Sequence, residues 1–596
     1  MFGWTTHLAA LAATAVLLAL SFPLPGWGFL AWVALVPAGW LAATSRKPGR
    51  LVVSALLIFV LWWVWMLRWL WPVTLPGALA MASFQALFWV AALWGTNIIV
   101  RRKRWPIALV LPVMWVAFEW LRGTFPFGGF GWFMLGHTQG AWSVSRPPWW
   151  AQFAGITGGL GFSLILAYVS GVLVTLRLRT TRIRKFLYVL SLAGLFVWSF
   201  CINALESANA KISRSPHFGT QVTVAVIQTN HPHDNKLSPT AESQEEDFAV
   251  LAALHAEAAA QNPDLIVWPE TVIPGEFNDE AAQRWRMGAH KIPPDDPYYD
   301  YFQAVTAMPF RARDLIVEHG VPTVVGASTE IQPRRDVEAI EHNSAFLVDA
   351  DGQAVARYDK MHLVPFGEYI PGPGWVKETV FSYFSPYDDF DYTIDPGELE
   401  TVFESPIRVP RNWAAVYGLD PSDGVDADDQ PEWEEGTLRF ATPICFEDTV
   451  GRLCRRMVFD AETGEKRVDA LVNLTNDGWF GEFQTGKVHH LNAAKWRAIE
   501  TGKYFMRAAN TGISGWVLNW SIGTSGRYKL ESGEGVVNVG LTPGMTTAYV
   551  ERIGEWPARL AFFAAIGLAI WPMIGTRNTN AAAGGAAEET TTEDDE

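Results

Sequence analysis

The sequence predicts a chain of two parts: a multi-span α-helical membrane domain and an α/β layered domain outside the cytoplasm. Mean hydropathy over the 596 residues is +0.10, with 30 Trp, which is too apolar for an ordinary soluble protein. Residues 1–205 hold 15 Lys+Arg and one acid, Glu119, whereas residues 206–596 hold 31 Lys+Arg and 60 Asp+Glu. In the acidic part, short β-branched runs alternate with helical stretches, as in α/β folds.

Eight stretches are apolar over about 20 residues, the length at which a helix crosses a bilayer. They lie near residues 6–22, 27–45, 51–71, 76–100, 106–122, 150–176, 186–204 and 556–575. Seven of them belong to a predicted membrane domain of residues 1–205, and the eighth lies in residues 551–576.

Basic clusters predict how these helices are oriented. The clusters begin at Arg46, Arg101 and Arg177 and follow the second, fourth and sixth stretch. The positive-inside rule places these loops and both termini in the cytoplasm, together with an acidic tail, 577–596, that is predicted to be disordered. The domain formed by residues 206–550 then lies outside, in the periplasm if the membrane is the inner membrane of a bacterium.

The connection 123–149 is rich in glycine and aromatic residues, notably over 127–132. This composition is typical of an aromatic belt at the membrane interface. It also fits the mouth of a path by which a lipid enters the protein.

Six short runs are predicted to be buried strands: 221–227, 264–268, 321–326, 345–348, 438–440 and 470–474. The pattern between them, for example over 247–261, is helical. Two stretches, 276–312 and 370–436, interrupt this alternation and are predicted to be loops or lids.

Cys445 lies where a predicted strand turns towards a helix. Backbone N–H groups and the helix dipole at such a turn favour a thiolate. The alternatives are a small buried apolar side chain, or a disulfide to Cys454, although a helix over 449–458 would bury Cys454. Glu270 and Lys360 lie upstream in similar strand-end settings, and these three residues together indicate acyl-transfer chemistry on a cysteine.

Four runs contain or follow these residues: 268–271, 358–368, 443–447 and 476–481. Their residues and order resemble the nitrilase superfamily, whose members carry a Glu–Lys–Cys triad. With seven apolar stretches before this region and one after it, the chain resembles the apolipoprotein N-acyltransferase family over nearly its whole length. The resemblance implies a nitrilase-like αββα sandwich for the second domain.

The resemblance also implies a role for each residue. Glu270 is the general base that takes the proton of the Cys445 thiol, which must ionise before it attacks an ester. Lys360 and the backbone N–H of Phe446 stabilise the oxyanion of the tetrahedral intermediate. Glu368 holds Lys360 in place.

Three more residues match pocket positions of the family: Glu447, Asn343 and Trp479. Simpler interpretations are a surface salt bridge for Glu368 and Glu447, an Asn that satisfies a turn, and a core Trp. Leu237 stands where the family usually has Trp. Aromatic residues of the two interrupting stretches are expected to form a membrane-touching lid, or else to pack under a loop: Tyr298, Tyr299, Phe302, Trp375, Phe381, Tyr383 and Phe384.

A membrane phospholipid as acyl donor, a diacylglyceryl-cysteine lipoprotein as acceptor and no cofactor are further implications of the resemblance. A metal site is not indicated, because the histidine pairs at 231/233 and 489/490 lack a carboxylate or cysteine at a recognisable ligand spacing. The acidic second part does not favour nucleic-acid binding, and no phosphate-binding glycine loop is present in the sequence.

Three functions fit these observations. The first is the acyl transfer just described, through a thioester on Cys445. The second is a membrane-tethered amidase that hydrolyses a small amide, and the third is a non-catalytic scaffold that binds lipoproteins. Eight spans exceed what tethering needs and the triad is complete, so the sequence favours acyl transfer.

Overall fold

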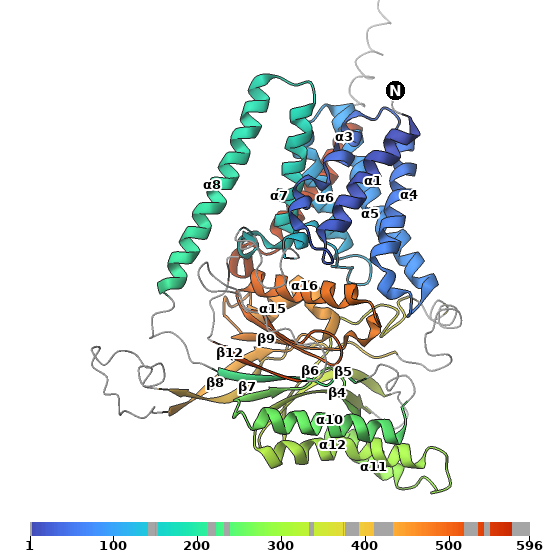
Figure 1. Cartoon of the computed structure of the whole chain (residues 1–596), viewed down its shortest axis with the longest axis vertical. Coiled ribbons are helices and arrows are strands. Elements are labelled where there is room, and N and C mark those ends of the chain that lie inside the picture. The colour runs from blue at the N-terminus through green and yellow to red at the C-terminus, as the bar shows by residue number, and fades with distance from the viewer. Residues whose placement is uncertain are drawn as a thin grey trace, which may run out of the picture.

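A computed structural model describes residues 3–140, 150, 153–212, 222–231, 239–332, 339–372, 375, 393–410, 433–517, 535–541, 547 and 549–574. Apolar helices form a bundle at one end, and two β-sheets with their covering helices form the other end (Figure 1). This arrangement confirms the predicted fold class, a helical membrane domain joined to a nitrilase-like α/β domain.

The bundle contains helices from both ends of the chain. They are α1 (Trp4–Ser21), α2 (Ala31–Ala34), α3 (Val36–Thr44), α4 (Pro48–Met66), α5 (Leu75–Lys103), α6 (Ile107–Arg122), α7 (Ala154–Arg177) and α17 (Trp556–Ile574). Helix α8 (Arg182–Ile212) follows α7 and runs apart from the bundle (Figure 1). Among the described residues, four helices are long and apolar enough to cross a membrane, namely α1, α4, α5 and α7, and two shorter apolar stretches are Gly28–Thr44 and Trp556–Leu568. The count of eight spans and the domain boundaries stay predictions.

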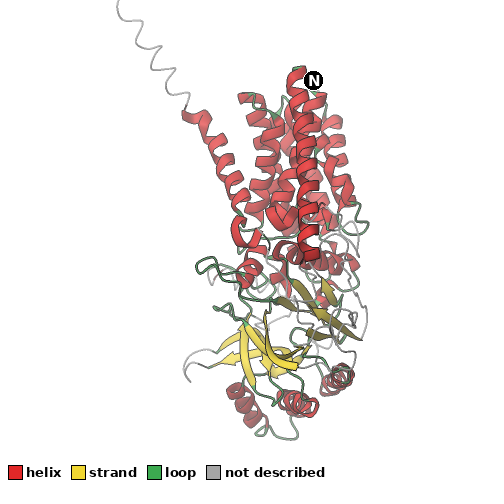
Figure 2. Ribbon diagram, turned by 90° about the vertical axis from the view of Figure 1, so that its left-hand side faces the viewer, coloured by secondary structure: helices red, strands yellow, loops and turns green. Residues whose placement is uncertain are grey.

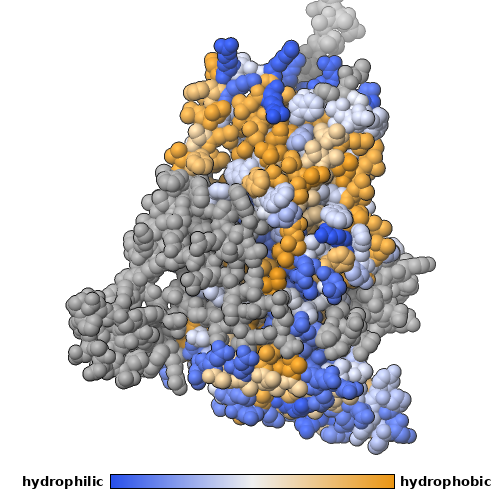
Figure 3. Space-filling model, viewed as in Figure 1, coloured by the Kyte–Doolittle hydropathy of each residue, from blue (hydrophilic) through white to orange (hydrophobic). Residues whose placement is uncertain are grey.

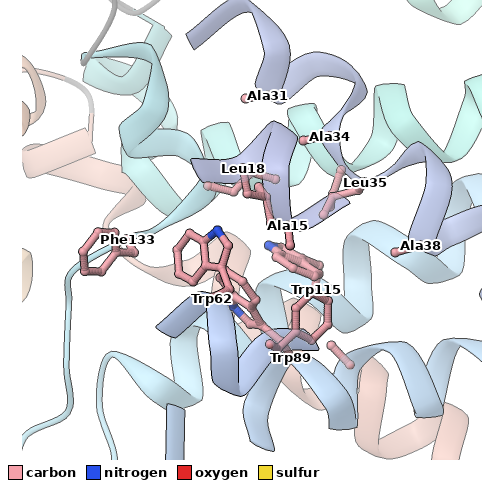
Figure 4. Packing of buried hydrophobic residues seen from close by; sticks show 14 of the residues in the cluster. Ala15, Leu18, Ala31, Ala34, Leu35, Ala38, Trp62, Trp89, Trp115 and Phe133 are labelled. Carbon is pink, nitrogen blue, oxygen red and sulfur yellow. The ribbon is translucent and has the colours of Figure 1, made fainter. Parts of the chain in front are cut away.

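Large aromatic side chains fill the middle of the bundle. Trp62 packs on Trp89 with ring centroids 4.6 Å apart, and Trp89 packs on Trp115 at 5.3 Å. Phe133 meets Trp62 edge-on at 5.7 Å, an arrangement that aromatic pairs favour (Figure 4). These rings come from three helices and one loop, so the hydrophobic cluster that they belong to joins those helices to the loop.

The loop that follows α6 contributes to this core. Phe130, Trp132 and Phe133 are buried, whereas Phe125 and Phe127 are exposed. The three buried rings therefore do not form a belt at the membrane surface, as the composition of 123–149 suggested. The loop turns back into the protein because its rings find apolar partners there.

Two sheets make up the α/β domain. The first has the order β12-β1-β2-β4-β5-β6, with β3 paired to β4, and the second has the order β11-β10-β9-β8-β7. The strands are β1 (Val222–Gln228), β2 (Leu265–Val267), β3 (Ile273–Glu276), β4 (Thr323–Ile331), β5 (Ile340–Val348), β6 (Ala354–Asp359), β7 (Phe403–Pro410), β8 (Trp433–Ala441), β9 (Ala470–Thr475), β10 (Tyr504–Ala509), β11 (Gly515–Val517) and β12 (Gly535–Leu541).

Alternation along β1 explains why the first sheet is covered on both faces. Val224 and Val226 pack into the cluster shared with the second sheet, while Ala225 and Ile227 pack against α10 (Ala241–Ala259) and α12 (Tyr299–His319). Side chains of a strand alternate between its two faces, so an apolar run is buried on both. The second sheet is covered by α15 (Gly451–Val458) and α16 (Gln484–Thr501).

These contacts place the layers in order along the molecule: bundle, α15 and α16, the two sheets, then α10, α12 and α11 (Asp279–Ala289) (Figures 1 and 2). In the space-filling view, apolar side chains gather over the bundle and hydrophilic ones over the opposite end (Figure 3). Helix α16 therefore lies between the bundle and the second sheet and is buried on both sides.

The prediction of loops at 276–312 and 370–436 is wrong in part. The first stretch contains α11 and the beginning of α12, and the second contains β7 and the start of β8. Helix α12 lies at the end of the molecule remote from the bundle (Figure 1). Tyr298, Tyr299 and Phe302 belong to the start of α12, so they are not a membrane-touching lid. Trp375 is 70% exposed, and the lid residues Phe381, Tyr383 and Phe384, like Leu237, lie outside the described residues.

Candidate active site

Cys445 occupies a sharp turn just after β8. It begins a short 3₁₀ helix, η6 (Cys445–Thr449), and its backbone φ is +49°. This left-handed conformation costs a non-glycine residue about 1–3 kcal/mol and persists where the surroundings impose it, as they often do at functional sites. The side chain is partly buried.

Glu270 follows β2 at a point where two backbones approach closely. A Cβ atom added to Gly326 of β4 would lie 2.2 Å from the carbonyl oxygen of Pro269 and 2.8 Å from the Cα of Glu270. Only glycine therefore lets the segment of Glu270 rest directly on β4.

Lys360 is brought to Glu270 by the pairing of two strands. Ser344 of β5 lies opposite Asp359 of β6, and the next residue, Lys360, donates its backbone N–H to the carbonyl of Asn343 at 2.9 Å. The Asn343 side chain in turn donates to Glu270 Oε1 at 2.7 Å. Asn343 thus links the backbone of Lys360 to the side chain of Glu270. It lies within β5, not in a turn.

The Lys360 ammonium is buried between two carboxylates. Its Nζ lies 2.6 Å from Glu368 Oε1 and 3.6 Å from Glu270 Oε1. Burial alone lowers the pKa of Lys360, but the carboxylates of Glu368 and Glu270 outweigh it and raise the pKa above its usual value. The site therefore holds a permanent cation, and Glu368 anchors it through an ion pair that is largely removed from solvent.

The Cys445 thiol is protonated at rest. Burial and the nearby Glu270 carboxylate raise its pKa, and the opposing effect of Lys360 is smaller. The expectation that the turn would favour a thiolate is wrong, because η6 is too short to supply a helix dipole and both desolvation and the Glu270 carboxylate disfavour the thiolate. A base must therefore remove the proton during the reaction.

Glu447 is buried and joins two arms of the site. It accepts hydrogen bonds from the backbone N–H of Ile444 at 2.7 Å and of Met361 at 2.8 Å, and from the hydroxyl of Tyr358 at 2.9 Å. Burial raises the pKa of Glu447 to about 7, although the hydrogen bonds that it accepts lower this pKa. Glu447 thus ties the chain at Cys445 to the chain at Lys360, and a surface salt bridge is excluded.

Two aromatic residues connect the site to the bundle. Phe446 and Trp479 both pack against the aromatic core of the bundle. Phe446 also stacks on His362, with centroids 5.9 Å apart and planes 15° from parallel. Cys445 therefore lies at the junction of the two domains.

The sequence did not predict a buried ionic network behind Cys445. It consists of Asp448, Asp477, His490 and Arg507, and Asp477 lies in a run already singled out for Trp479. Its members come from η6, η7 (Asp477–Phe480), α16 and β10, so only the fold brings them together. Among the described residues, no group of His, Cys, Asp and Glu side chains is arranged to hold a metal ion.

Comparisons with known proteins cover both domains. Residues 14–172 match the family model described as apolipoprotein N-acyltransferase N-terminal domain, and residues 223–531 match the carbon-nitrogen hydrolase model. The apolipoprotein N-acyltransferase of Geobacter metallireducens is 29% identical over 84% of this chain and 82% of its own. That of Rhodopirellula baltica is 24% identical over 94% of this chain and 96% of its own.

Solved structures align with the second domain. Saccharomyces cerevisiae Nit3, a member of branch 10 of the nitrilase superfamily, is 16% identical, with a TM-score of 0.31 over 55% of this chain and 92% of that chain. An amidase from Nesterenkonia sp. AN1, in a form with an acetamide moiety added at its active-site cysteine, is 15% identical, with a TM-score of 0.32 over 57% of this chain and 97% of that chain.

Proposed function

This chain belongs to the carbon-nitrogen hydrolase family, and we propose that it works as an apolipoprotein N-acyltransferase. It acylates lipoproteins in a bacterial membrane. We assign the acyl donor to a membrane phospholipid and the acceptor to the N-terminal α-amine of a diacylglyceryl-cysteine. A thioester on Cys445 carries the acyl chain between them.

In the first half-reaction, Glu270 takes the thiol proton while Cys445 Sγ bonds to the ester carbonyl carbon of the phospholipid. The negative charge of the tetrahedral intermediate faces Lys360 and the backbone N–H of Phe446. The intermediate collapses by breaking the bond to the glycerol oxygen, which receives the proton from Glu270 and leaves as lysophospholipid. The acyl chain remains on sulfur as a thioester.

In the second half-reaction, the lipoprotein amine attacks the thioester carbonyl and Glu270 takes the proton that the amine loses. The C–S bond breaks, Cys445 recovers its proton from Glu270, and the acyl chain leaves as an amide. The same base and the same oxyanion donors serve both steps, which supports a single site for donor and acceptor.

The position of the nucleophile carries this proposal. Phe446, the residue next to Cys445, packs against the core of the bundle, so a lipid ester that reaches Cys445 leaves its chains close to the apolar helices. A small amide needs no such position, so the tethered amidase is not favoured. A scaffold would need neither the strained turn at Cys445 nor the buried Lys360 ion pairs.

We further propose that residues 206–550 face the periplasm and that both termini are cytoplasmic. Basic residues flank alternate predicted spans, which supports this orientation. The substrate lipoprotein then meets the catalytic domain on the outer face of the inner membrane.

Intact-mass analysis tests the proposal. The purified protein is mixed with a diacyl phospholipid, and a matched sample receives a dialkyl ether phospholipid that has no ester. We expect an acyl adduct on the protein in the first sample alone, and its loss on addition of a diacylglyceryl-cysteine peptide with a free amine. An adduct that is lost to water equally fast without the peptide would favour the amidase.

A further inference from the structure

The buried ionic network behind Cys445 has a position that packing alone does not explain. His490 of α16 lies next to the carbonyl oxygen of Cys445, with Nε2 at 3.3 Å from it. On its other side, the imidazole stacks on Trp132 at 5.8 Å and meets Phe480 edge-on at 5.9 Å. His490 therefore connects the nucleophile's backbone to the aromatic core of the bundle.

Acceptors surround both ring nitrogens of His490. Nδ1 lies 2.7 Å from Asp477 Oδ1, and Nε2 faces Asp448 Oδ1 at 3.0 Å as well as the Cys445 carbonyl. Carboxylate and carbonyl oxygens donate no hydrogen, so these three oxygens favour a hydrogen on each ring nitrogen. Arg507 Nη2 lies 3.0 Å from Nδ1 and can only donate, so this contact acts against a hydrogen on Nδ1. Asp477 Oδ1 lies closer to Nδ1, at 2.7 Å, and accepts from Arg507 as well.

Charge balance leads to the same protonation state. Asp448 and Asp477 are fully buried, and Arg507, which pairs with both, supplies one positive charge. The four-residue network is neutral only if His490 supplies the second. The alternative, an uncompensated buried carboxylate, is costly. The two carboxylates accordingly raise the pKa of His490 to about 9, although burial alone would lower it.

An imidazolium at this point acts on one particular peptide group. The carbonyl of Cys445 and the N–H of Phe446 belong to the same trans peptide and point in opposite directions. A donor that holds the carbonyl therefore sets the direction of the N–H. A charged donor also polarises the peptide, which makes its N–H a stronger hydrogen-bond donor.

We propose that His490, as an imidazolium ion held by Asp448 and Asp477, is a positioning residue that aims the Phe446 N–H at the oxyanion. The oxyanion in this inference comes from the proposed acyl transfer, whereas the contacts of His490 do not depend on that proposal. Asn473 assists, because its side-chain amide donates to Pro443 O at 2.9 Å and to Cys445 O at 3.4 Å. The left-handed turn at Cys445 is thus held from two sides.

The test compares two reactions of Cys445. Acylation by p-nitrophenyl butyrate passes through an oxyanion and needs no lipid recognition, whereas alkylation by iodoacetamide forms no oxyanion. We expect His490→Gln to slow the p-nitrophenolate burst by about 10²-fold or more, in line with losing an oxyanion donor, and to leave the alkylation rate near that of wild type. Because the ester is soluble, the burst can be measured even if phospholipid is not the acyl donor.

His489→Gln is the matched control. His489 is the preceding residue of α16, is also buried, and stacks on Phe133 at 4.5 Å, but the described contacts of its ring do not include Cys445. We expect its burst to match wild type. The proposal would be overturned if the burst were slowed equally in both variants, or if it were unchanged in His490→Gln. It would also be overturned if His490→Gln slowed the burst and the alkylation of Cys445 by the same factor.

A measurement on the unmutated protein covers the case in which His490→Gln does not fold. Nitrogen-15 NMR of labelled histidine reports whether each ring nitrogen carries a hydrogen. We expect His490 to carry both at pH 7.5, while His489 is neutral. A neutral His490 at that pH would overturn the proposal by itself.

Discussion

Cys445 and Cys454 show how two cysteines nine residues apart differ in chemistry. Burial raises the pKa of both thiols, so acidity does not distinguish them. The backbone does, because Cys445 has a φ of +49° while Cys454 lies on the buried face of α15. Both are free thiols, which excludes the disulfide that the sequence allowed.

The first prediction follows from this difference. Cys445→Ala is expected to abolish the acyl adduct, because no other described thiol adjoins Lys360 and Glu270. Cys454→Ala is expected to keep it, with a small loss of stability from the vacated volume. Intact mass after incubation with phospholipid measures both, and loss of the adduct from both variants would contradict the assignment of Cys445.

The second prediction concerns the base. Because the thiol is protonated at rest, Glu270→Gln is expected to slow alkylation of Cys445 and thioester formation by about 10²–10⁴-fold. Glu276→Gln is the control, because burial raises the pKa of Glu276 to about 8, so at neutral pH it is mostly protonated and resembles Gln. If Cys445 in Glu270→Gln were alkylated at the wild-type rate, Glu270 would not be the general base.

At the scale of elements, the site depends on how closely β2 and β4 approach. Gly326 permits the contact, and the pairing of β5 with β6 then places Lys360 beside the same carboxylate. Helix α16 closes the site from the bundle side and carries two adjacent histidines with opposite electrostatic surroundings.

The third prediction tests the approach of β2 to β4. In Gly326→Ala the new methyl group would collide with the backbone at Pro269, so Glu270 must move, and we expect a stability loss of about 1–3 kcal/mol together with lost acylation. Gly288→Ala in α11 meets no atom within 4 Å and should gain about 0.5–1 kcal/mol. Thermal unfolding in detergent and the ester burst measure the two effects, and full activity in Gly326→Ala would contradict the account.

The fourth prediction uses the two histidines of α16. The pKa of His490 is raised to about 9, so its contribution to stability is complete below about pH 6.5 and disappears as the pH rises through about 9. Burial and Arg68 lower the pKa of His489 to about 3, so its neutral form is favoured and stability falls as the pH drops below about 6.5. Unfolding curves from pH 5 to 9 should therefore lose their alkaline decline in His490→Gln and part of their acid decline in His489→Gln. The same pH dependence in both variants would contradict the assignment.

At the scale of the whole molecule, the bundle and the α/β domain form one continuous structure around Cys445. Helix α16 packs on the second sheet with one face and on the bundle with the other, and Trp496 reaches the bundle by donating to the carbonyl of His137 at 3.2 Å. The turn at Cys445 is therefore held directly against the membrane domain and not on a flexible tether.

The fifth prediction concerns orientation in the membrane. A reporter fused after residue 50 is expected to be cytoplasmic, and one inserted within 370–436 is expected to be periplasmic, because the basic clusters follow alternate spans. Activity of paired phosphatase and fluorescent reporters at each position measures this. The opposite pattern would separate the catalytic domain from lipoproteins on the outer face.

The sequence alone was sufficient for those features that are encoded locally. Runs of β-branched residues marked six of the strands, and apolar length marked the long helices. The runs around Glu270, Lys360 and Cys445 pointed to the carbon-nitrogen hydrolase family that the comparisons show. The short strands β3 and β11 were not predicted, because three or four residues show too little periodicity to indicate a strand. The helices α11 and α12 escaped because their charged and aromatic content resembles that of a loop.

The tertiary structure decided what depends on residues far apart in the chain. Sheet order and strand pairing brought Asn343 between Glu270 and Lys360, and burial made the Cys445 thiol hard to ionise despite its position at a turn. The network around His490 joins four elements that share no local pattern, and its four charged or titratable side chains are buried together only in the folded chain. Spacing in a sequence encodes periodicity and turns, whereas desolvation and long-range contacts exist only once the chain has folded.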